Sequence, residues 1–289
     1  IKPAALDRRK AAMQARRRWN WRVLYDCMDE WENFPLIGPP ILEAEQELVR
    51  ECDLLVVTAQ KLWDKWQNFG RPMALARNAA DFQFYQQRCR PNGRLPGLRH
   101  PIVGYYGAIA AWFDLDLLAF AARRRPEYTF VLLGGIFDVD VSPLRALPNV
   151  HLLGQQPYET MPEYLYHFDA CLIPFKINPI TEATDPVKVY EYLSGGKPVV
   201  SGALPELEPY REQLYLASGP DDFLMQLDRA LAEDSAERAA SRRALAAQNT
   251  WEERYRRIDA ALKGGTVSRV SLVLITWNNL SLTRQCVES

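Results

Sequence analysis

Between residues 102 and 202, short apolar runs alternate with longer stretches in which apolar residues recur with the period of a helix. The predicted strands are Ile102–Gly107, Thr129–Gly134, Val150–Gly154, Ala170–Phe175 and Pro198–Gly202, and the predicted helices are Trp112–Arg124, Tyr158–His167 and Pro186–Ser194. Apolar strands separated by helices of this length favour a doubly wound parallel sheet. We therefore predict a Rossmann-like domain in this region.

The preceding part of the chain has a shorter version of the same pattern. Two apolar runs, Trp21–Asp26 and Asp53–Ala59, flank a helical stretch at Ile41–Cys52, and a third run follows at Met73–Asn78. The order strand, helix, strand predicts a second Rossmann-like domain, which is incomplete.

Turn-forming residues and a change of period suggest where the domains begin and end. The polar segment 91–101 is rich in Pro and Gly, as linkers are, and the chain becomes helical from Pro220 to Lys263. The predicted parts are a partial N-terminal domain at 1–90, a linker at 91–101, a C-terminal domain at 102–248, a helix and linker at 249–265, and the start of a further domain at 266–289. Since the sequence lacks an initiator Met and a new strand begins near its end, we expect a fragment cut at both ends.

Composition narrows the class of protein. The formal net charge of −1 over 289 residues gives no bulk attraction to nucleic acid, so we expect no nucleic-acid partner. The sequence has no apolar run of about 18 residues and no signal-peptide pattern. Its five scattered cysteines form no CxxC pair, which favours the cytoplasm. The basic stretch Ile1–Trp19 is either a solvated helix or a contact with anionic lipid, which would place the protein peripherally on the inner face of the plasma membrane.

The segment Asp185–Pro198 (DPVKVYEYLSGGKP) contains the best candidate for an anion site. Asp185 can cap a helix and Pro186 suits its first turn, which leaves backbone N–H groups and the positive end of the helix dipole available to a phosphate. Lys188 adds a full charge, and Glu191, three residues on, can accept two hydrogen bonds from a ribose diol. The alternative interpretation is an ordinary capped helix with a Lys–Glu ion pair.

This segment and its continuation, DPVKVYEYLSGGKPVVSGALPEL, resemble the PxKxxEYLAxGkPVV signature of retaining, family 4-like GT-B glycosyltransferases that build bacterial surface polysaccharides. Other stretches resemble that family in the same order: VLYDCMDEWENF, ECDLLVVTAQKLWDKW, ARNAADFQFY, VGYYGAIAAWFDLDLLAFAARRRPEYTFVLLGG and NVHLLGQQPYETMPEYLYHFDACLIPF. The resemblance covers about Trp21–Ala261 and implies an α/β protein of GT-B type with two Rossmann-like doubly wound domains, the N-terminal one incomplete. It also implies sugar transfer from a nucleoside diphosphate sugar to an acceptor hydroxyl, with retention at the anomeric carbon.

The resemblance also implies roles for individual residues. Glu191 matches the second glutamate of the family's EX7E motif, which in relatives holds the ribose hydroxyls, and Lys188 matches a lysine near the diphosphate. The first glutamate, which contacts the donor sugar, would fall at Ala183, one position from Glu182, so Lys188 and Glu182 are the predicted catalytic residues. Many relatives carry an Arg and a Lys after the first strand of this domain. Here no basic residue occurs before Arg123, so Lys188 carries more of the charge.

Loops after the predicted strands supply further candidates, because ligands of a doubly wound sheet bind beyond the carboxyl ends of its strands. The predicted donor-binding residues are Gly107 and Ala108 after the first strand, Tyr158 after the third, Asn178 and Thr181 after the fourth, and Glu191 and Pro186 on the helix that follows. Small residues let the backbone approach a diphosphate, and relatives recognise the nucleotide base near the position of Tyr158. Each of these residues also has an ordinary interpretation as a turn, core or cap residue.

The last twenty residues, VSLVLITWNNLSLTRQCVES, resemble the first strand and helix of family 2, GT-A-type glycosyltransferases. The full-length protein is therefore expected to be a tandem glycosyltransferase. Thr276, Trp277 and Asn278 would begin the nucleotide site of its second domain.

The expected partners are a nucleotide sugar and a glycan or lipid-linked glycan acceptor. The sequence has no metal-spaced His pair and no GxSxG, HExxH or P-loop motif, and GT-B enzymes as a class need no metal, so we expect no cofactor and no metal site. Two alternatives stay open. One is a GT-B-fold sugar-nucleotide epimerase, and the other is an inactive nucleotide-sugar-binding scaffold of a polysaccharide assembly complex.

Overall fold

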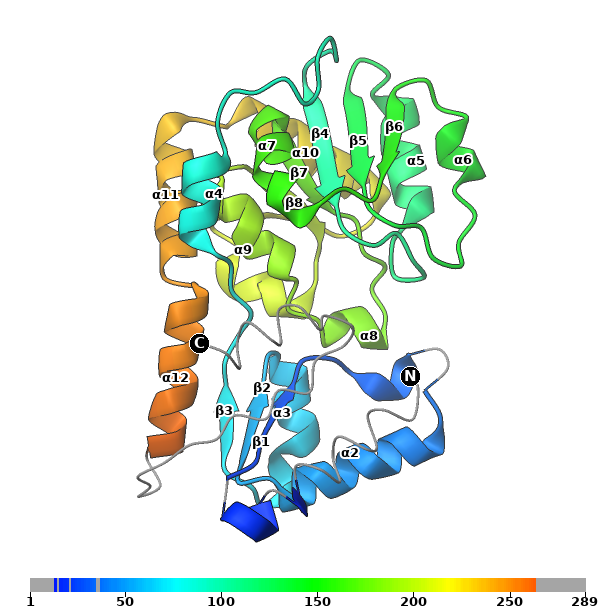
Figure 1. Ribbon diagram of the computed structural model, residues 1–289. Coiled ribbons are helices and arrows are strands. Elements are labelled where there is room, and N and C mark those ends of the chain that lie inside the picture. The colour runs from blue at the N-terminus through cyan, green and yellow to red at the C-terminus, as the bar shows by residue number, and fades with distance from the viewer. Residues whose placement is uncertain (1–12, 15, 21, 35–36, 264–289) are drawn as a thin grey trace. The chain divides into compact units, whose positions relative to one another are not determined.

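The computed structural model describes residues 13–14, 16–20, 22–34 and 37–263, and the chain divides into two compact units (Figure 1). Unit 1 comprises Ile1–Arg77 and Arg254–Ser289, and unit 2 comprises Asn78–Glu253. The basic stretch Ile1–Trp19 lies mostly outside the described residues. The predicted further domain at 266–289 lies entirely outside them.

Unit 2 contains a six-stranded parallel sheet with the strand order β6-β5-β4-β7-β8-β9. Its strands are β4 (Ile102–Tyr106), β5 (Thr129–Leu133), β6 (Val150–Gly154), β7 (Ala170–Ile173), β8 (Val199–Gly202) and β9 (Tyr215–Ala217). This is the order of the Rossmann sheet, in which the chain starts at the centre, builds outward, and returns to build the other half. The five predicted strands are confirmed. The strand β9 is additional, because a run of three residues is too short to show a period.

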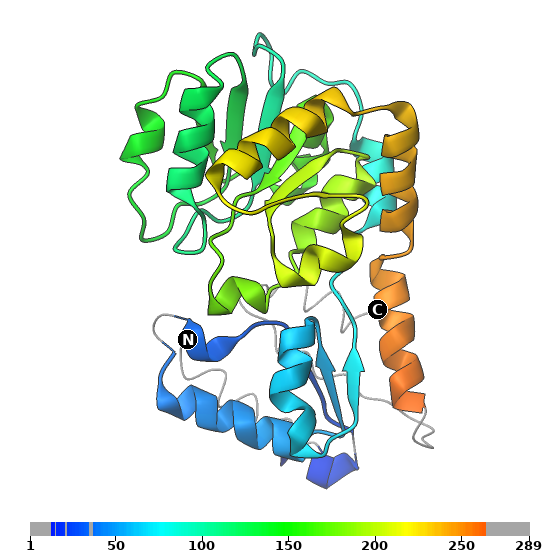
Figure 2. The same cartoon turned by 180° about the vertical axis from the view of Figure 1, so that it is seen from behind.

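Helices cover both faces of this sheet. They are α4 (Phe82–Arg88), α5 (Leu115–Arg124), α6 (Ser142–Arg145), α7 (Met161–His167), α8 (Pro179–Glu182), α9 (Val187–Ser194), α10 (Pro220–Ala232) and α11 (Ala236–Ala247). Helices α5 and α10 pack on one face, and α4, α7 and α9 pack on the other. Figure 2 shows α10 lying across the face of the sheet that it shares with α5. The buried side chains of the strands and of both helical layers form one apolar core, as the doubly wound pattern requires.

Unit 2 begins at Asn78, whereas the sequence pattern placed the boundary in the segment 91–101. The reason is α4, which buries Tyr85 in the core of unit 2 and whose Gln86 side chain donates to the carbonyl oxygen of Ser194. The segment 91–101 itself belongs to unit 2, where the side-chain amide of Asn92 donates to the carbonyl oxygen of Glu163 at 2.8 Å. A stretch with the composition of a linker is here a surface connection within one domain.

Unit 1 is built from two separate parts of the chain. Its parallel sheet has the order β1-β2-β3, with β1 (Leu24–Cys27), β2 (Leu54–Val57), β3 (Met73–Leu75) and the helices α2 (Pro39–Glu51) and α3 (Gln60–Trp66). The predicted C-terminal helix is confirmed as α12 (Trp251–Lys263), and its residues from Arg254 onward belong to unit 1. Leu262 of α12 is buried against Leu24 and Leu54, and the Arg254 guanidinium donates to both oxygens of Asp26, at 2.7 and 2.8 Å.

None of the helices in the described part of the chain has the length and apolar character needed to cross a membrane.

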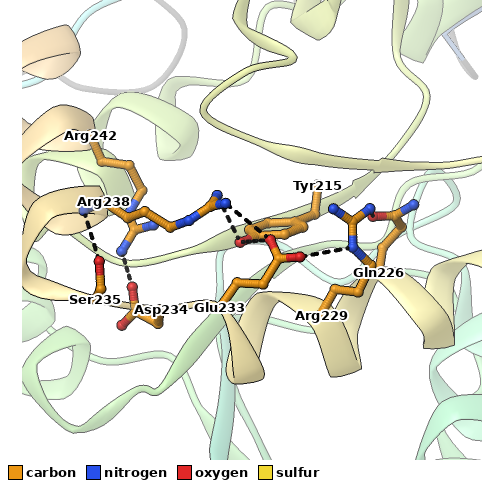
Figure 3. A network of polar contacts seen from close by, with 8 residues as sticks. All are labelled: Tyr215, Gln226, Arg229, Glu233, Asp234, Ser235, Arg238 and Arg242. Atoms are coloured by element: carbon orange, nitrogen blue, oxygen red, sulfur yellow. Dashed lines mark hydrogen bonds and ion pairs between the residues drawn. The ribbon is translucent and has the colours of Figure 1, made fainter.

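A buried arginine ties α11 to the end of α9. Arg242 is 2% exposed, its Nε donates to the carbonyl oxygen of Gly196 at 2.8 Å, and its Nη2 forms an ion pair with Asp234. Figure 3 shows the ion pair between Arg242 and Asp234 beside a neighbouring network in which Glu233 binds Arg229 and Arg238. Burying a guanidinium group without hydrogen-bond partners is costly. The contacts with Gly196 and Asp234 offset that cost for Arg242.

We expect Arg242→Met to lower the free energy of unfolding by about 2 kcal/mol, because it removes a charge-assisted hydrogen bond and leaves the Gly196 carbonyl without that donor. The matched control is Arg211→Met, which removes an exposed ion pair with Glu208 and should not change stability measurably. Urea unfolding of the three proteins measures the difference. Equal stability of the two variants would show that the buried contact contributes nothing.

Candidate functional site

The reversal of strand order in unit 2 lies between β4 and β7, which pair directly. Loops leave such neighbouring strands in opposite directions, so a crevice forms at their carboxyl ends, and ligands of open α/β sheets bind there. Gly107 and Ala108 follow β4, and Phe175 and Asn178 follow β7. The topology therefore brings together the loops that the sequence pattern selected.

Two glycines allow the backbone after β4 and β5 to approach closely. Gly107 has φ 137° and Gly134 has φ 149°, conformations that residues with a Cβ rarely adopt. A Cβ on Gly134 would lie 1.8 Å from the carbonyl oxygen of Gly107, and one on Gly107 would lie 2.9 Å from Cε of Lys188. The positive φ of Gly107 favours glycine there, and a Cβ would also displace the end of the Lys188 side chain. Donor binding by Gly107 and Ala108 stays a prediction.

Lys188, in the first turn of α9, lies over the Gly107 backbone. Its Nζ is 5.0 Å from the ring centroid of Phe175 and 5.6 Å from that of Tyr105. Within the described residues its ammonium has no hydrogen-bond or ion-pair partner, so it forms no ion pair with Glu191. Desolvation lowers the pKa of Lys188 to about 8, although the nearby charge of Glu191 acts in the opposite direction.

Glu191, one turn further along α9, is 6% exposed. The hydroxyl of Tyr158 donates to its Oε1 at 3.0 Å, and the Tyr158 ring stacks on Phe84 with centroids 5.5 Å apart and planes 5° apart. Desolvation raises the pKa of Glu191, and the hydrogen bond from Tyr158 and the charge of Lys188 only partly offset this effect. Tyr158 remains 49% exposed, so its ring is accessible to a ligand while its hydroxyl orients Glu191.

The start of α9 differs from the expected capped helix. The N-cap residue is Pro186, with no side-chain cap, and Asp185 does not cap. Instead the buried Asp185 carboxylate accepts the backbone N–H of Asn78 at 2.6 Å and the hydroxyl of Tyr190 at 2.9 Å. The carbonyl oxygen of Asp185 accepts the side-chain amide of Asn78 at 2.6 Å. Asp185 therefore anchors the helix instead of occupying its first backbone N–H groups, which Pro186 leaves without a side-chain cap.

The loop between β7 and α9 uses its polar side chains locally. Asn178 and Thr181 form a reciprocal capping box at the start of α8, and Thr181, 1% exposed, also donates to the carbonyl oxygen of Lys176. Thr181 is therefore a structural residue in this conformation, and its donor contact stays a prediction, as does that of Asn178. Glu182 ends α8 half-buried, and Ala183 beside it is fully buried. No group of three or more His, Cys, Asp or Glu in the described residues could hold a metal ion.

Three aromatic residues beside the site were not singled out from the sequence. Tyr105 and Phe175 contact Lys188, and Phe84 supports Tyr158. Tyr105 lies in β4 and Phe175 shortly follows β7, near the carboxyl ends of the strands at the switch point, so their place in the pattern was a usable signal. The pairing of Phe84 with Tyr158 joins positions far apart in the sequence, and the sequence gives no sign of it.

A family model described as "Glycosyl transferase-like" matches residues 115–260, half of the chain. The chain belongs to this glycosyl transferase-like family. Among curated proteins, it is 27% identical over 265 residues to TuaH of Bacillus subtilis (strain 168), whose name assigns it provisionally as a teichuronic acid biosynthesis glycosyltransferase. The match covers 83% of this chain, and the chain spans 66% of the length of TuaH.

Solved structures share the fold. Anabaena HepE, in complex with UDP and glucose, matches with a TM-score of 0.66 at 18% identity, covering 91% of this chain and 76% of HepE. An Escherichia coli structure bound with UDP-2-fluoro glucose, titled as trehalose-6-phosphate, matches with a TM-score of 0.65 at 13% identity, covering 89% of this chain and 71% of the other. This member of the glycosyl transferase-like family therefore has the α/β fold with parallel sheets of GT-B glycosyltransferases, as the sequence resemblance implied.

We expect Gly134→Ala to destabilise the protein by roughly 3 kcal/mol or more, because the new Cβ would collide with the Gly107 carbonyl and the backbone would be strained. Gly93→Ala is the matched control, since a Cβ there meets nothing within 4 Å. Thermal unfolding compares them. A Gly134→Ala protein as stable as the control would contradict the close approach of the two loops.

Glu191→Gln should make the protein more stable at neutral pH, by roughly 1 kcal/mol, because it removes a desolvated carboxylate while keeping an acceptor for Tyr158. The folded-state pKa of Glu191 is raised above its ordinary value of 4.5. The ionised carboxylate therefore destabilises the folded protein fully above the folded-state pKa, and this destabilisation disappears below 4.5. The gain should accordingly shrink as the pH falls toward 4.5. Denaturant unfolding at several pH values tests this, with the exposed neighbour Glu159→Gln as the control. A gain independent of pH would refute the assignment.

Proposed function

We propose that the protein transfers a sugar from a nucleoside diphosphate sugar to an acceptor hydroxyl in the synthesis of a cell-surface polysaccharide. The observation that carries the proposal is the placement of Lys188 and Glu191 on one helix at the switch point, with the ammonium above the Gly107 backbone. HepE, which shares the fold, binds UDP and glucose, and the name of TuaH points to teichuronic acid synthesis. Both agree with this substrate class.

The charges of the site match the proposed reaction. As the glycosidic bond of the donor breaks, negative charge grows on the leaving diphosphate, and a preorganised cation with free N–H groups stabilises that charge. Lys188 supplies a positive charge, and the first turn of α9 adds the positive end of the helix dipole. Glu191, oriented by Tyr158, supplies a carboxylate that can accept both hydroxyls of a ribose. The small residues Gly107 and Ala108 would let the backbone approach the diphosphate.

Further parts of the proposal rest on the family resemblance alone. Transfer proceeds with retention, requires no metal or other cofactor, and uses Glu182 and Asn178 toward the donor sugar. The acceptor is a glycan or lipid-linked glycan. The residues 266–289 begin a GT-A-type domain. A separate part of the proposal rests on the basic residues of Ile1–Trp19, which contact anionic lipid from the cytoplasmic side.

A non-catalytic scaffold that binds nucleotide sugars is the second candidate. Ala183 occupies the place of the family's first glutamate, is fully buried and has no polar group with which to bind a sugar hydroxyl. This observation favours binding without transfer. A panel of nucleoside diphosphate sugars separates the two functions, because an enzyme yields free nucleoside diphosphate and a glycosylated acceptor, whereas a scaffold shows only thermal stabilisation by the bound sugar nucleotide.

We expect Lys188→Ala to retain its fold by circular dichroism and to lose most of the transfer rate measured with a donor from that panel. In the unchanged protein the rate should fall as the pH rises through about 8, because Lys188 is charged below its pKa and neutral above it. Lys263→Ala is the control, since Lys263 is exposed and pairs with Asp259. Full transfer by Lys188→Ala, or an unchanged pH profile, would exclude the proposed role of this lysine.

A further inference from the structure

Two aromatic rings form the immediate surroundings of the Lys188 ammonium. Its Nζ lies 5.0 Å from the ring centroid of Phe175 and 5.6 Å from that of Tyr105, within the range of cation–π attraction. Phe175 follows β7 and Tyr105 lies in β4, so the two rings come from the two strands that meet at the switch point. The lysine thus contacts both halves of the sheet at once.

Both rings are held firmly in place. The Tyr105 hydroxyl donates to the carbonyl oxygen of Ala108 at 2.8 Å, and the ring of Phe113 packs edge-on against Tyr105 with centroids 4.9 Å apart. Phe113 and Phe175 form a backbone bridge, and all three side chains are buried. A ring that cannot turn away holds its electron-rich face toward the cation at little further cost in entropy.

Lys65 in unit 1 also lies over an aromatic ring, 4.7 Å from the centroid of Trp66, but carboxylates hold its ammonium as well. Its Nζ forms ion pairs with Glu30 and Glu32. Desolvation lowers the pKa of Lys65, but the hydrogen bonds that its ammonium donates to these carboxylates and their charges outweigh it, so the pKa is raised. A lysine paired in that way has fewer N–H groups for a ligand, and its carboxylates repel an incoming phosphate. Aromatic rings attract the cation without using its hydrogen bonds and without adding negative charge.

We propose that Tyr105 and Phe175 form an aromatic seat that keeps the Lys188 ammonium charged, unpaired and directed above Gly107 for the diphosphate of the donor. The seat deepens the proposed function and rests on it. Tyr105 and Phe175 are positioning residues, since they act through Lys188. The seat also explains how a single lysine can serve where relatives carry two further basic residues, because all of its N–H groups remain available to the ligand.

The test replaces Phe175 in the full chain with mono-, di- and trifluorinated phenylalanine, which keep the shape of the ring but progressively weaken its attraction for a cation. The matched control is the same fluorinated series at Phe223, a buried residue of α10 on the opposite face of the sheet from α9. The pKa of Lys188 is followed by NMR titration of labelled lysine side chains, with Lys188→Arg identifying the resonance. Calorimetry measures the affinity for UDP at pH 6.5 and pH 8.

Fluorination should lower the pKa of Lys188 stepwise, because it removes stabilisation of the charged form. It should weaken UDP binding roughly threefold to tenfold at pH 8 for the trifluorinated ring, and less at pH 6.5, where Lys188 stays charged. The same substitutions at Phe223 should change neither quantity. Circular dichroism checks that each variant folds, and Phe175→Leu, which lacks a ring, should resemble the trifluorinated protein.

Results contrary to these expectations distinguish failure of the aromatic seat from failure of the proposed function. An unchanged Lys188 pKa across the fluorinated series would overturn the seat, and UDP binding that still depends on Lys188 would then leave the proposed function standing. A pKa that falls with no change in UDP affinity would overturn the role of the seat in phosphate binding, and it would also count against Lys188 as a diphosphate ligand. An equal effect of the Phe223 series would assign the change to fluorination of the core and refute the cation–π account.

Discussion

The position of helix α9 is the constraint on which the site depends, and it is fixed at both ends by buried polar contacts. At its start, the carboxylate of Asp185 accepts from Asn78 and Tyr190. Beyond its end, the carbonyl oxygen of Gly196 accepts from the buried Arg242. Such contacts have strict distance and angle requirements, whereas apolar packing alone permits a helix to slide. These contacts fix the position of α9 and therefore that of Lys188 and Glu191.

The site retains two ionisable groups whose charged forms are disfavoured by their surroundings. Desolvation lowers the pKa of Lys188 and raises that of Glu191, and in neither case do the neighbouring contacts restore the ordinary value. A site selected only for stability would replace both with apolar residues. Groups of this kind are typical of binding and catalytic sites, where a ligand can supply the missing partner.

The parts of the molecule that the sequence predicted are those set by local pattern. Apolar runs predicted five of the six strands of unit 2, and the spacing of Lys188 and Glu191 placed both on one helix. What the sequence did not predict involves distant pairs. Asn78 contacts Asp185 across 107 positions, and Tyr158 reaches Glu191 across 33. Because such contacts depend on how elements pack, no short window of sequence encodes them. The same limit explains why α4 was assigned to the wrong domain.

The division of unit 1 between the two ends of the described chain has a consequence for biogenesis. Unit 2 is a continuous segment, Asn78–Glu253, so it can fold as soon as it has left the ribosome. Unit 1 cannot complete its core until α12 delivers Leu262 to Leu24 and Leu54. Although its strands are synthesised first, they must wait for nearly two hundred further residues. During translation unit 2 is thus finished before unit 1, and the apolar residues of β1 and β2 stay uncovered until α12 has been made.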